Sequence, residues 1–479
     1  MRLSFGLEVG HRRFMRAAIV LAAGKGTRLK SRIPKVLHPV AGQPMVQTAV
    51  ERARQAGLDA VVVVVGHGAE AVQATVEAVF PNVCRFALQT EQRGTGHAAR
   101  IGLQALPPQT EGRVLILSAD APLLRQQTVD RLVDGGPTVR FLTAEVPEPR
   151  GYGRVVRGAD GRVQRIVEEK DATEGERAIR EVNAGTYWVD LRFLREAVAG
   201  LDTDNAQGEL YLTDVVETAA RRGEAEALRV DDPTEIRGVN DRTELAEAER
   251  IRYAREVRRH QVQGVTVNDP ASVRIDPGVV IGPDTVIEPR VTIRGACTVG
   301  AGCRVDVGSV LEDAEIEDGV TIHPYTVVEG ATLRTGSVAG PFARLRPGTV
   351  LEPEARVGNF VELKNTTLGP GAKANHLSYL GDARVGRGAN IGAGTITCNY
   401  DGFGKYPTRI GDGAFVGSNA TLVAPLDIGT GAYVAAGSAL TDPVPDDGLA
   451  FGRARQTVKP ERARAVREAA QKRAQRGKD

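Results

Sequence analysis

The chain has 479 residues with 62 Lys and Arg against 60 Asp and Glu, and its formal net charge of +2 excludes a strongly basic nucleic-acid binder and an acidic tail protein. Its length predicts two or three domains, each with room for a large core. Aromatic residues make up only 4% of the chain, whereas glycine occurs 55 times. Part of the protein therefore packs with few rings and turns often.

Cysteine usage and hydropathy indicate the cellular compartment in which the protein is expected. The four cysteines show neither a C-x-x-C motif nor metal-ligand spacing, which favours a reducing cytoplasm over a disulfide framework. No apolar run approaches the roughly 18 residues that a membrane span needs, so no membrane partner is expected. Residues 1–16 carry several arginines without a long apolar run. We therefore expect a dispensable extension and not a signal peptide, with Met15 as a candidate start.

The first half of the chain alternates between strand and helix patterns. Apolar runs at 18–22, 61–65 and 114–117 are typical of fully buried strands, and the patterns at 45–56 and 69–79 are typical of amphipathic helices. This alternation predicts a parallel sheet with helices on both faces.

After residue 264 the aliphatic residues recur every six positions. A period of six with small residues beside it is the signature of a parallel β-helix, whose narrow lumen excludes rings and whose corners favour Gly. A β-sandwich, the weaker alternative, would require alternation with a period of two. The in-register runs are Ile275, Ile281, Ile287, Ile293, Val299 and Val305; Ile316, Ile322 and Val328; Leu345, Leu351 and Val357; and Ile410, Val416, Leu422, Ile428, Val434 and Leu440.

Two segments depart from this rhythm. Residues 400–409 (YDGFGKYPTR) interrupt the repeats, and we expect a functional loop that projects outward, since a solenoid tolerates insertions only on its outside. Residues 458–479 form a basic tail. We interpret this tail as a solvated segment and not as a nucleic-acid patch.

A glycine-rich turn, LAAGKGTR at residues 21–28, follows the first predicted strand, and Pro34 and Lys35 come shortly after it. The turn is neither a Walker A loop nor a dinucleotide fingerprint. Its backbone N–H groups could approach phosphates at the open end of a parallel sheet, with Arg28 and Lys35 adding positive charge. Taken alone, the turn leaves a purely structural role open.

The wider pattern LAAGxGxRL…PK resembles the nucleotide-sugar pyrophosphorylases, which join a sugar 1-phosphate to a nucleoside triphosphate. Together with the period-six half, residues 17–457 resemble the family of bifunctional N-acetylglucosamine-1-phosphate uridyltransferase/glucosamine-1-phosphate acetyltransferases. The resemblance implies an α/β Rossmann-like nucleotidyltransferase domain followed by a left-handed parallel β-helix of hexapeptide repeats. The further motifs that carry it are LQTEQRGTGHA (88–98), DAPL (120–123), GYGR (151–154), VEEKDA (167–172), NAGT (183–186), NAQGE (205–209) and GVN (238–240).

The composition change after residue 264 and the range of the resemblance, 17–457, imply a division of the chain into five parts. Residues 241–263, where Leu245, Ala248, Ile251 and Ala254 recur among charges, are expected to form a linker helix. The parts are an extension (1–16), a uridyltransferase domain (17–240), the linker helix (241–263), a β-helix acetyltransferase domain (264–457) and the basic tail (458–479).

The resemblance implies that the first domain transfers a uridylyl group from UTP to N-acetylglucosamine 1-phosphate and releases pyrophosphate. Mg²⁺ would be held by Asp120 and Asn240, while Arg28 and Lys35 would stabilise charge on the triphosphate. Two departures from the family pattern are Ala119, where Gly is expected, and Arg93, where a neutral residue is common. The residues implied for the nucleotide are Leu21, Ala22, Ala23, Gly24, Gln89, Gly94 and Thr95, and those for the sugar are Gly153, Glu168 and Asn183.

The second implied reaction is acetyl transfer from acetyl-CoA to glucosamine 1-phosphate. A lone His is commonly structural, but His376 lies in NHLSYLGD (375–382) and accompanies RLRP (344–347), FVELK (360–364) and NIGAGTITCNYD (390–401), so it is the expected general base. The resemblance implies Arg346, Lys364, Tyr379 and Asn390 for the acetyl acceptor, and Ala393, Asn399, Tyr400, Lys405, Ser418, Ala436 and Arg453 for acetyl-CoA and the completion of the site.

Other candidate groups are assigned structural roles. Cys398 is interpreted as a packing residue and not as a nucleophile, and His38, His67, His97 and His323 lack comparable motifs. The resemblance also implies a cytoplasmic homotrimer with acetyl-transfer sites between subunits, which supplies a precursor for the peptidoglycan and lipopolysaccharide of the cell wall.

Two alternatives stay open at this point. The first is a pyrophosphorylase for another sugar or base, whose β-helix serves only to oligomerise the protein. The second is a regulatory assembly subunit with a dead nucleotide site, which the joint presence of Lys35, Asp120 and Asn240 disfavours.

Overall fold

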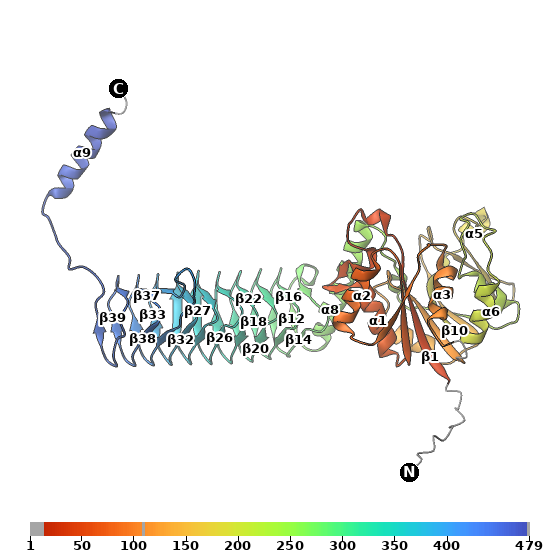
Figure 1. Cartoon of the computed structure of the whole chain (residues 1–479), viewed down its shortest axis with the longest axis horizontal. Coiled ribbons are helices and arrows are strands. Elements are labelled where there is room, and N and C mark those ends of the chain that lie inside the picture. The colour runs from red at the N-terminus through yellow and green to blue at the C-terminus, as the bar shows by residue number, and fades with distance from the viewer. Residues whose placement is uncertain (1–13, 108–110, 477–479) are drawn as a thin grey trace, which may run out of the picture. The chain divides into compact units, whose positions relative to one another are not determined.

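Residues 14–107 and 111–476 are described by a computed structural model (Figure 1), and the chain divides into two units. The first unit contains the described residues up to Glu256 together with Ile275–Pro277. The second contains Val257–Arg274 and the described residues from Gly278 onward. Each unit is taken by itself below.

The first unit is built on a nine-stranded sheet whose main path runs β11-β7-β10-β6-β1-β4-β5. The three strands expected from the apolar runs are confirmed, and β1 begins at Met15, within the segment expected to be an extension. Residues 1–13 of that segment lie outside the described residues. The strand bounds are β1 (Met15–Ala22), β4 (Ala60–Val65), β5 (Cys84–Leu88), β6 (Gly112–Ser118), β7 (Val139–Glu145), β10 (Glu181–Asp190) and β11 (Ala225–Arg229).

The expected parallel pairing is confirmed for β1, β4, β5 and β6 and between β7 and β11, but β10 departs from it. Strand β10 lies between β6 and β7 and runs antiparallel to both of them. It follows the antiparallel hairpin of β8 (Arg154–Arg157) and β9 (Val163–Val167) and the single-turn α5 (Glu174–Arg177). A parallel strand would need a longer crossover, usually a helix, to return the chain to the starting edge.

Helices cover both faces of this sheet, because alternate residues of its strands point to opposite sides. Ala18 and Val20 of β1 belong to a core with α1 (Met45–Gln55), α2 (Ala69–Val79) and α4 (Gln126–Val133). Ala17 and Ile19 belong to a second core with α3 (Thr95–Gln104), α6 (Leu191–Ala199) and α7 (Asp214–Ala220). The shorter elements are η1 (Thr27–Leu29), η2 (Lys35–Leu37), β2 (Pro39–Val40), β3 (Gln43–Pro44) and η3 (Pro233–Ile236).

A long helix, α8 (Arg242–Val262), occupies the segment expected to be a linker. Its start is explained by Asp241, whose carboxylate accepts the backbone N–H groups of Thr243 and Glu244 at 2.9 Å each. Leu245, Ala248 and Ile251 pack with Leu123 and Val239 of the first unit. This part of α8 therefore belongs to the core of the first unit.

The second unit is a parallel β-helix, as the period of six predicts, and it is left-handed, as the family resemblance implies. Three parallel sheets of 11, 10 and 9 strands form its faces, from β12 (Thr266–Val267) to β41 (Leu449–Ala450), and appear as stacked coils in Figure 1. Leu345, Leu363 and Leu380 pair in register on successive coils and are fully buried. Such aliphatic ladders fill the interior.

The glycine excess has a steric cause at the corners. A Cβ built on Gly282 would lie 2.6 Å from the backbone nitrogen of Ala301 in the next coil, and one on Gly411 would lie 2.5 Å from that of Thr430. Only glycine lets the backbones of neighbouring coils approach so closely.

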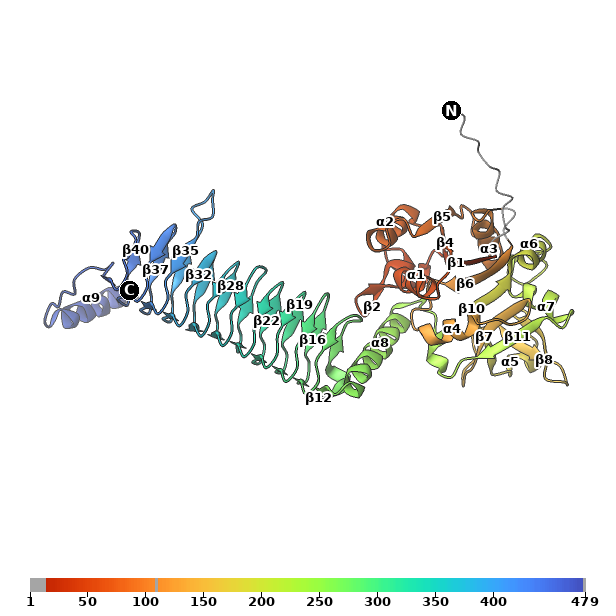
Figure 2. The same cartoon turned by 90° about the horizontal axis from the view of Figure 1, so that it is seen from below.

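The insertion between β34 (Ile396–Cys398) and β35 (Thr408–Ile410) projects outward as predicted (Figure 2). Tyr400 and Lys405 form an isolated antiparallel bridge at its base. The Asp401 carboxylate accepts the backbone N–H groups of Phe403 at 2.9 Å and Gly404 at 2.7 Å, while the Phe403 side chain is 99% exposed. The tip is therefore ordered by its own hydrogen bonds and exposes an aromatic ring.

Beyond the coils, α9 (Arg462–Arg476) forms a helix within the basic tail, and its residues up to position 475 are exposed. None of the helices in the described ranges combines the length and apolar character needed to span a membrane.

We predict that Leu363→Ala destabilises the β-helix by about 2–5 kcal/mol, because it opens a cavity in a fully buried ladder. The measurement is the free energy of unfolding of the full chain in a urea titration. Val280→Ala is the control, since Val280 is 60% exposed and its truncation should cost less than about 0.5 kcal/mol. Equal losses in the two variants would contradict a ladder-filled interior.

Candidate active sites

The first candidate site lies at the edge of the sheet where β1, β4, β5 and β6 end. Parallel strands present their carboxyl ends at one edge, so Ala22, Gln89 and Asp120 come to the same side although they are far apart in sequence. Asn183 reaches this edge from the first part of the antiparallel β10. The topology thus gathers most of the nucleotide and sugar residues expected from sequence.

Lys35, Asp120 and Asn240 meet at one point of this edge. The Lys35 Nζ atom donates to Asp120 Oδ2 at 2.5 Å and to Asn240 Oδ1 at 2.8 Å. Ser118 Oγ donates to the other Asp120 oxygen at 2.5 Å, and Val239 N donates to the Asp120 carbonyl at 2.8 Å. Two hard oxygen donors therefore converge on a position that a cationic group occupies, which fits the donor set that Mg²⁺ prefers.

The glycine-rich turn leaves backbone open beside this point. Gly24 is exposed, and a Cβ placed on it would have no neighbouring atom within 4 Å. Gly26 has φ +62° and would place a Cβ 2.4 Å from Lys35 Cβ, so a glycine is needed for the lysine to pass. Arg28 is exposed, and its side chain makes no hydrogen bond or ion pair within the described part of the chain, so it is not joined to the Lys35 cluster. Its positive charge is available to a ligand.

The residues after β5 that are expected to bind the nucleotide lie in the segment between β5 and α3 and at the start of α3. Gln89 is buried, and its Nε2 atom lies 3.1 Å from His97 Nδ1. Gly94 has φ +100°, and a Cβ there would lie 2.5 Å from the Leu210 carbonyl oxygen, so this close approach requires glycine. Thr95 Oγ1 accepts from the backbone N–H of Leu212 at 3.2 Å.

The two departures from the family pattern lie outside the polar cluster. Ala119 is 1% exposed and belongs to the apolar core shared with α1 and α4, so its methyl group packs inward and does not narrow a pocket. The Arg93 side chain is exposed, as the sequence allowed, while its carbonyl accepts from Leu210 N at 2.9 Å. Neither residue obstructs Asp120.

Asn183 and Glu168, two of the residues expected to bind the sugar, both lie against the third, Gly153. Asn183 N donates to the Gly153 carbonyl at 2.9 Å, and a Cβ on Gly153 would lie 3.5 Å from both oxygens of Glu168. Thr213 Oγ1 donates to Glu168 Oε1 at 3.1 Å. Burial raises the pKa of Glu168 above its ordinary value, with Asp214 among the carboxylates that add to the shift.

The second candidate site follows one corner of the β-helix. The exposed His376 ends β30 (Lys373–His376), pairs in register with Asn359 of β27 (Arg356–Asn359), and has Nδ1 3.1 Å from Asn359 Oδ1. Asn359 Oδ1 can only accept a hydrogen bond, so this contact assigns the proton to Nδ1 and the lone pair to Nε2.

Small residues continue the same corner on the next coils. Four strands on successive coils pair in register: β30, β33 (Asn390–Ile391), β36 (Phe415–Val416) and β39 (Tyr433–Val434). This register places Ala393, Ser418 and Ala436 on the coils that follow His376, each at the corresponding position. Backbone bonds link them: Asn419 N donates to Ala393 O at 2.7 Å and Gly437 N to Ser418 O at 2.8 Å. We call Ala393, Ser418 and Ala436 the small-residue track. The exposed Arg453 lies near its end, with its Cδ atom 3.8 Å from a Cβ built on Gly437.

Three cations gather on the adjoining face. Arg346 and Lys364 occupy neighbouring coils, and Lys405 reaches Lys364 from the insertion loop. Hydrogen-bond contact with Lys405 lowers the pKa of Lys364, and the like charges of Lys405 and Arg346 add to this shift. Arg346 Nη1 also contacts Glu362 Oε1 at 3.0 Å. Such crowding of positive charge fits an anionic ligand such as a phosphate.

Asp382 ties this cationic face to the insertion loop. Its carboxylate accepts from Asn399 Nδ2 at 2.5 Å and from Asn365 Nδ2 at 2.7 Å. Burial opposes ionisation, but these hydrogen bonds and the two lysines lower the pKa of Asp382 overall. Asp382 therefore stays ionised and holds Asn399 in place.

The polar ends of Tyr379 and Asn399 both pack against Gly381, in space that a larger side chain at this position would need. A Cβ on Gly381 would lie 2.5 Å from the Tyr379 hydroxyl oxygen and 2.7 Å from Asn399 Nδ2. Asn390 lies on the neighbouring sheet, in register with Lys373. Tyr400 is turned toward its own loop, because its hydroxyl donates to Gly402 O at 2.6 Å and its ring is 60% exposed.

Sequence reasoning missed several partners that orient these groups. Ser118 and Asp382 lay inside or beside quoted motifs, so their polar side chains were an available signal. Asn359 precedes His376 by the length of one coil, which was a usable spacing. Thr213 carried no sequence signal, because its contact with Glu168 is tertiary. Glu244, whose carboxylate accepts from Asn240 N at 2.6 Å, lies only four residues further along, so the acidic residue in the first turn of the predicted helix was an available signal.

Among the described residues, the other histidines and the cysteines belong to no metal-ligand cluster. His38 is buried and His67 is exposed, while His97 and His323 contact Gln89 and Asp306, respectively. Within the described ranges, no group of three or more His, Cys, Asp or Glu is arranged to hold a metal. A cation at Asp120 and Asn240 would therefore complete its coordination with substrate and water oxygens.

Comparison with known proteins agrees with both units. Residues 18–183 match the family model of the MobA-like NTP transferase domain. The chain is 56% identical over 448 residues to a protein of Anaeromyxobacter dehalogenans named "Bifunctional protein GlmU", covering 92% of this chain and 91% of the relative. Proteins of the same name from Sorangium cellulosum and Lactococcus lactis subsp. lactis are 50% and 48% identical, with 92% and 94% of this chain and 94% and 98% of theirs covered.

We predict a pH-dependent effect of Asp214→Asn. Burial, with help from Glu217, Asp202 and Asp171, raises the pKa of Asp214 from 3.8 to about 6. The folded chain then holds more protons than the unfolded chain between about pH 4 and pH 6, so this group's contribution to stability is lost as pH rises through that window. Because Asn mimics the protonated acid, the variant should melt a few degrees, roughly 2–4 °C, above the parent at pH 8 and close to it at pH 4.

Thermal unfolding at both pH values measures this difference. The exposed Asp204→Asn is the matched control and should show no such pH dependence. A constant difference between Asp214→Asn and the parent at pH 4 and pH 8 would contradict the raised pKa.

Proposed function

This chain belongs to the family of bifunctional GlmU proteins, and from that premise we propose how its two units share the chemistry. The protein is a bifunctional transferase: it acetylates glucosamine 1-phosphate with acetyl-CoA and then joins the N-acetylated product to the uridylyl group of UTP. The observation that carries this conclusion is identity of about half the residues over more than nine-tenths of this chain and its relatives.

The first unit is proposed to catalyse uridylyl transfer. An oxygen of the sugar phosphate attacks the α-phosphorus of UTP, a new P–O bond forms, and the bond to the bridging oxygen breaks as pyrophosphate leaves. Asp120 and Asn240 would hold Mg²⁺, whose charge neutralises the triphosphate. Lys35, next to both oxygens, and the exposed Arg28 supply further positive charge to the phosphates, and so act by electrostatic stabilisation.

The remaining residues of this unit are proposed to select the ligands. The backbone of residues 21–24, with Gln89, Gly94 and Thr95, would bind the nucleotide, since amide groups match the donors and acceptors of uracil. Gly153, Glu168 and Asn183 would bind the N-acetylated sugar. The position of Gly153 supports one compact subsite, because its carbonyl accepts from Asn183 N and its Cα faces the Glu168 carboxylate.

The β-helix is proposed to catalyse acetyl transfer with His376 as the general base. Nε2 takes one proton from the acceptor ammonium, and the amine attacks the thioester carbonyl to form the C–N bond. The C–S bond then breaks, and the leaving sulfur takes the excess proton of the attacking nitrogen, so that coenzyme A departs as its thiol. The contact of Asn359 with Nδ1 supports this role, since it holds the tautomer that a base needs.

The acceptor and acetyl-CoA are proposed to lie on either side of His376. Arg346, Lys364 and Lys405 would bind the sugar phosphate, and Tyr379, Asn390 and Asn399 the hexosamine. Acetyl-CoA would follow the track of small residues toward Arg453, whose guanidinium suits its phosphates. The residues of that track are Ala393, Ser418 and Ala436, with Tyr400 beside them on the insertion loop.

Finer features remain part of the proposal. We infer a cytoplasmic homotrimer in which neighbouring copies complete the acetyl-transfer sites, and the domain bounds 17–240, 241–263 and 264–457. A pyrophosphorylase for another sugar, with a β-helix that only oligomerises, is disfavoured by the base, the cations and the track on the β-helix surface.

The decisive experiment incubates the full chain with glucosamine 1-phosphate, acetyl-CoA, UTP and Mg²⁺ and identifies the product by mass. We expect UDP-N-acetylglucosamine, free thiol and pyrophosphate. Formation of a nucleotide sugar without acetyl-CoA-dependent release of thiol would favour the alternative.

We predict that single substitutions separate the two activities. His376→Ala removes the base and should lower acetyl transfer by about 10²–10⁴-fold while sparing uridylyl transfer. Asp120→Asn removes a charged metal ligand and should lower uridylyl transfer by about 10²-fold or more while sparing acetyl transfer. Each half-reaction is assayed with its own substrates, and the spared activity reports that the variant is folded. Loss of both activities from either substitution would refute two independent sites.

A further inference from the structure

The proposed metal ligands lie on two loops whose packing supports an inference about how they are positioned. We call residues 120–125 the aspartate loop, since it starts at Asp120, and residues 232–240 the asparagine loop, since it ends at Asn240. Their one backbone hydrogen bond near the ligands joins Val239 N to Asp120 O at 2.8 Å. Both loops lie outside regular sheet, so strand pairing alone does not determine the spacing of the two ligands.

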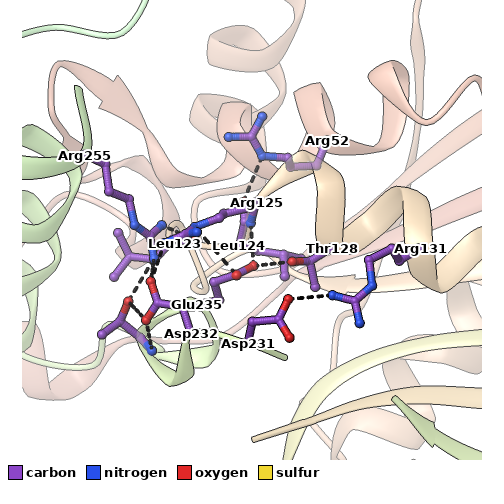
Figure 3. A network of polar contacts seen from close by, with 11 residues as sticks. Arg52, Leu123, Leu124, Arg125, Thr128, Arg131, Asp231, Asp232, Glu235 and Arg255 are labelled. Atoms are coloured by element: carbon purple, nitrogen blue, oxygen red, sulfur yellow. Dashed lines mark hydrogen bonds and ion pairs between the residues drawn. The ribbon is translucent and has the colours of Figure 1, made fainter. Parts of the chain in front are cut away.

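Side chains from three different elements hold the backbone of the aspartate loop (Figure 3). Arg255 of α8 donates from Nη1 to Leu123 O at 2.5 Å, and Arg52 of α1 donates from Nε to Leu124 O at 2.9 Å. The next backbone N–H, that of Arg125, donates to Glu235 Oε2 of η3 at 3.0 Å. Three backbone groups of two consecutive peptide units are thus held by charged side chains, which make the stronger class of hydrogen bond.

Glu235 connects the two loops from within the core. Its side chain is only 2% exposed, and besides Arg125 N it accepts from Thr128 Oγ1 at 2.6 Å. A buried carboxylate is retained only where its oxygens are satisfied, so the arrangement of these donors is constrained. Because Glu235 belongs to the asparagine loop and its partners belong to the aspartate loop and α4, it fixes one loop relative to the other.

Arg255 makes a second bridge between the same loops. While Nη1 binds the aspartate loop, Nη2 contacts Asp232 Oδ2 at 3.1 Å and Thr234 Oγ1 at 2.8 Å at the start of the asparagine loop. Arg125 also pairs with Asp232. The planar fork of a guanidinium suits this geometry, since it presents several donors in fixed directions.

The first turn of α8 contacts Asn240, one of the two proposed metal ligands. Glu244 Oε2 accepts from the backbone N–H of Asn240 at 2.6 Å, and Arg242 Nε donates to Leu29 O of η1 at 3.3 Å. One helix therefore contacts the asparagine loop, the aspartate loop and η1, the element that follows the glycine-rich turn.

From these contacts we propose that Arg255 and Glu235 are positioning residues for uridylyl transfer, setting the spacing of Asp120 and Asn240 at which both bind one metal–nucleotide complex. Neither side chain touches the ligand position, so both act through the loop backbone. The inference rests on the proposed roles of Asp120 and Asn240. It also gives α8 a part in the first reaction beyond that of a linker.

The test measures binding of Mn²⁺ to the full chain with saturating UTP and no sugar phosphate, by water-proton relaxation. Arg255→Gln and Glu235→Gln should each weaken Mn²⁺ binding by about tenfold or more, the usual effect of removing groups that orient metal ligands. The Mg²⁺ concentration for half-maximal uridylyl transfer should rise in parallel, while acetyl transfer by the same variants stays at the parent level. Arg255→Lys, which keeps the charge but not the fork, should recover part of the affinity.

Asp231→Asn is the matched control. Asp231 pairs with Arg131 at 2.8 Å on the exposed rim of the same network, and its side chain is 84% exposed. It does not touch the backbone of the aspartate loop, so its Mn²⁺ affinity should equal that of the parent.

A further variant, Asp120→Asn, separates failure of this inference from failure of the ligand assignment. Unchanged Mn²⁺ binding by Asp120→Asn would overturn the assignment itself. If Asp120→Asn loses binding while Arg255→Gln and Glu235→Gln keep parent affinity, only the positioning inference is overturned. An equal loss in Asp231→Asn would overturn it as well. Should Glu235→Gln fail to fold, which loss of acetyl transfer would reveal, the partly exposed Arg255 decides the outcome.

Discussion

Register-fixed pairing of parallel strands is the interaction on which both units depend. In the first unit it brings the ends of β1, β5 and β6 to one edge, where the Gly-rich turn, Gln89 and Asp120 meet. In the β-helix it stacks Asn359 and His376 on successive coils of the same corner. Backbone hydrogen bonds set the spacing in both cases, so side chains distant in sequence become neighbours at a defined distance.

Local concentration of charge, not net charge, prepares each site for its ligands. The chain is nearly neutral overall, yet Lys364 and Lys405 crowd together on the β-helix, and Lys35 lies between two oxygens in the first unit. Like charges brought together cost free energy until an anion binds, so the folded framework must impose the arrangement. Buried carboxylates such as Glu235 contribute to that framework, since their satisfied hydrogen bonds restrict the loops around them.

Much of the fold was predictable because its signals are local. Apolar runs of strand length marked β1, β4 and β6, and the period of six marked the coils, since each repeat buries one aliphatic residue at the same place. The antiparallel β10 was not predicted, because strand direction depends on the connection and on partners elsewhere in the chain. The orienting contacts of Thr213 and Arg255 also escaped prediction, since neither residue belongs to a motif.

By itself, the sequence determined the classes of the two units, the glycine-rich turn and the identities of groups able to do the chemistry, such as Asp120 and His376. These depend on composition, periodicity and motif order, which the chain carries before it folds. Only the tertiary structure decided which of these groups meet: Lys35 with Asp120 and Asn240, His376 with Asn359, and α8 with the loops it holds. The reason is physical, because a hydrogen bond requires atoms within about 3 Å and only packing brings together residues as far apart in sequence as these.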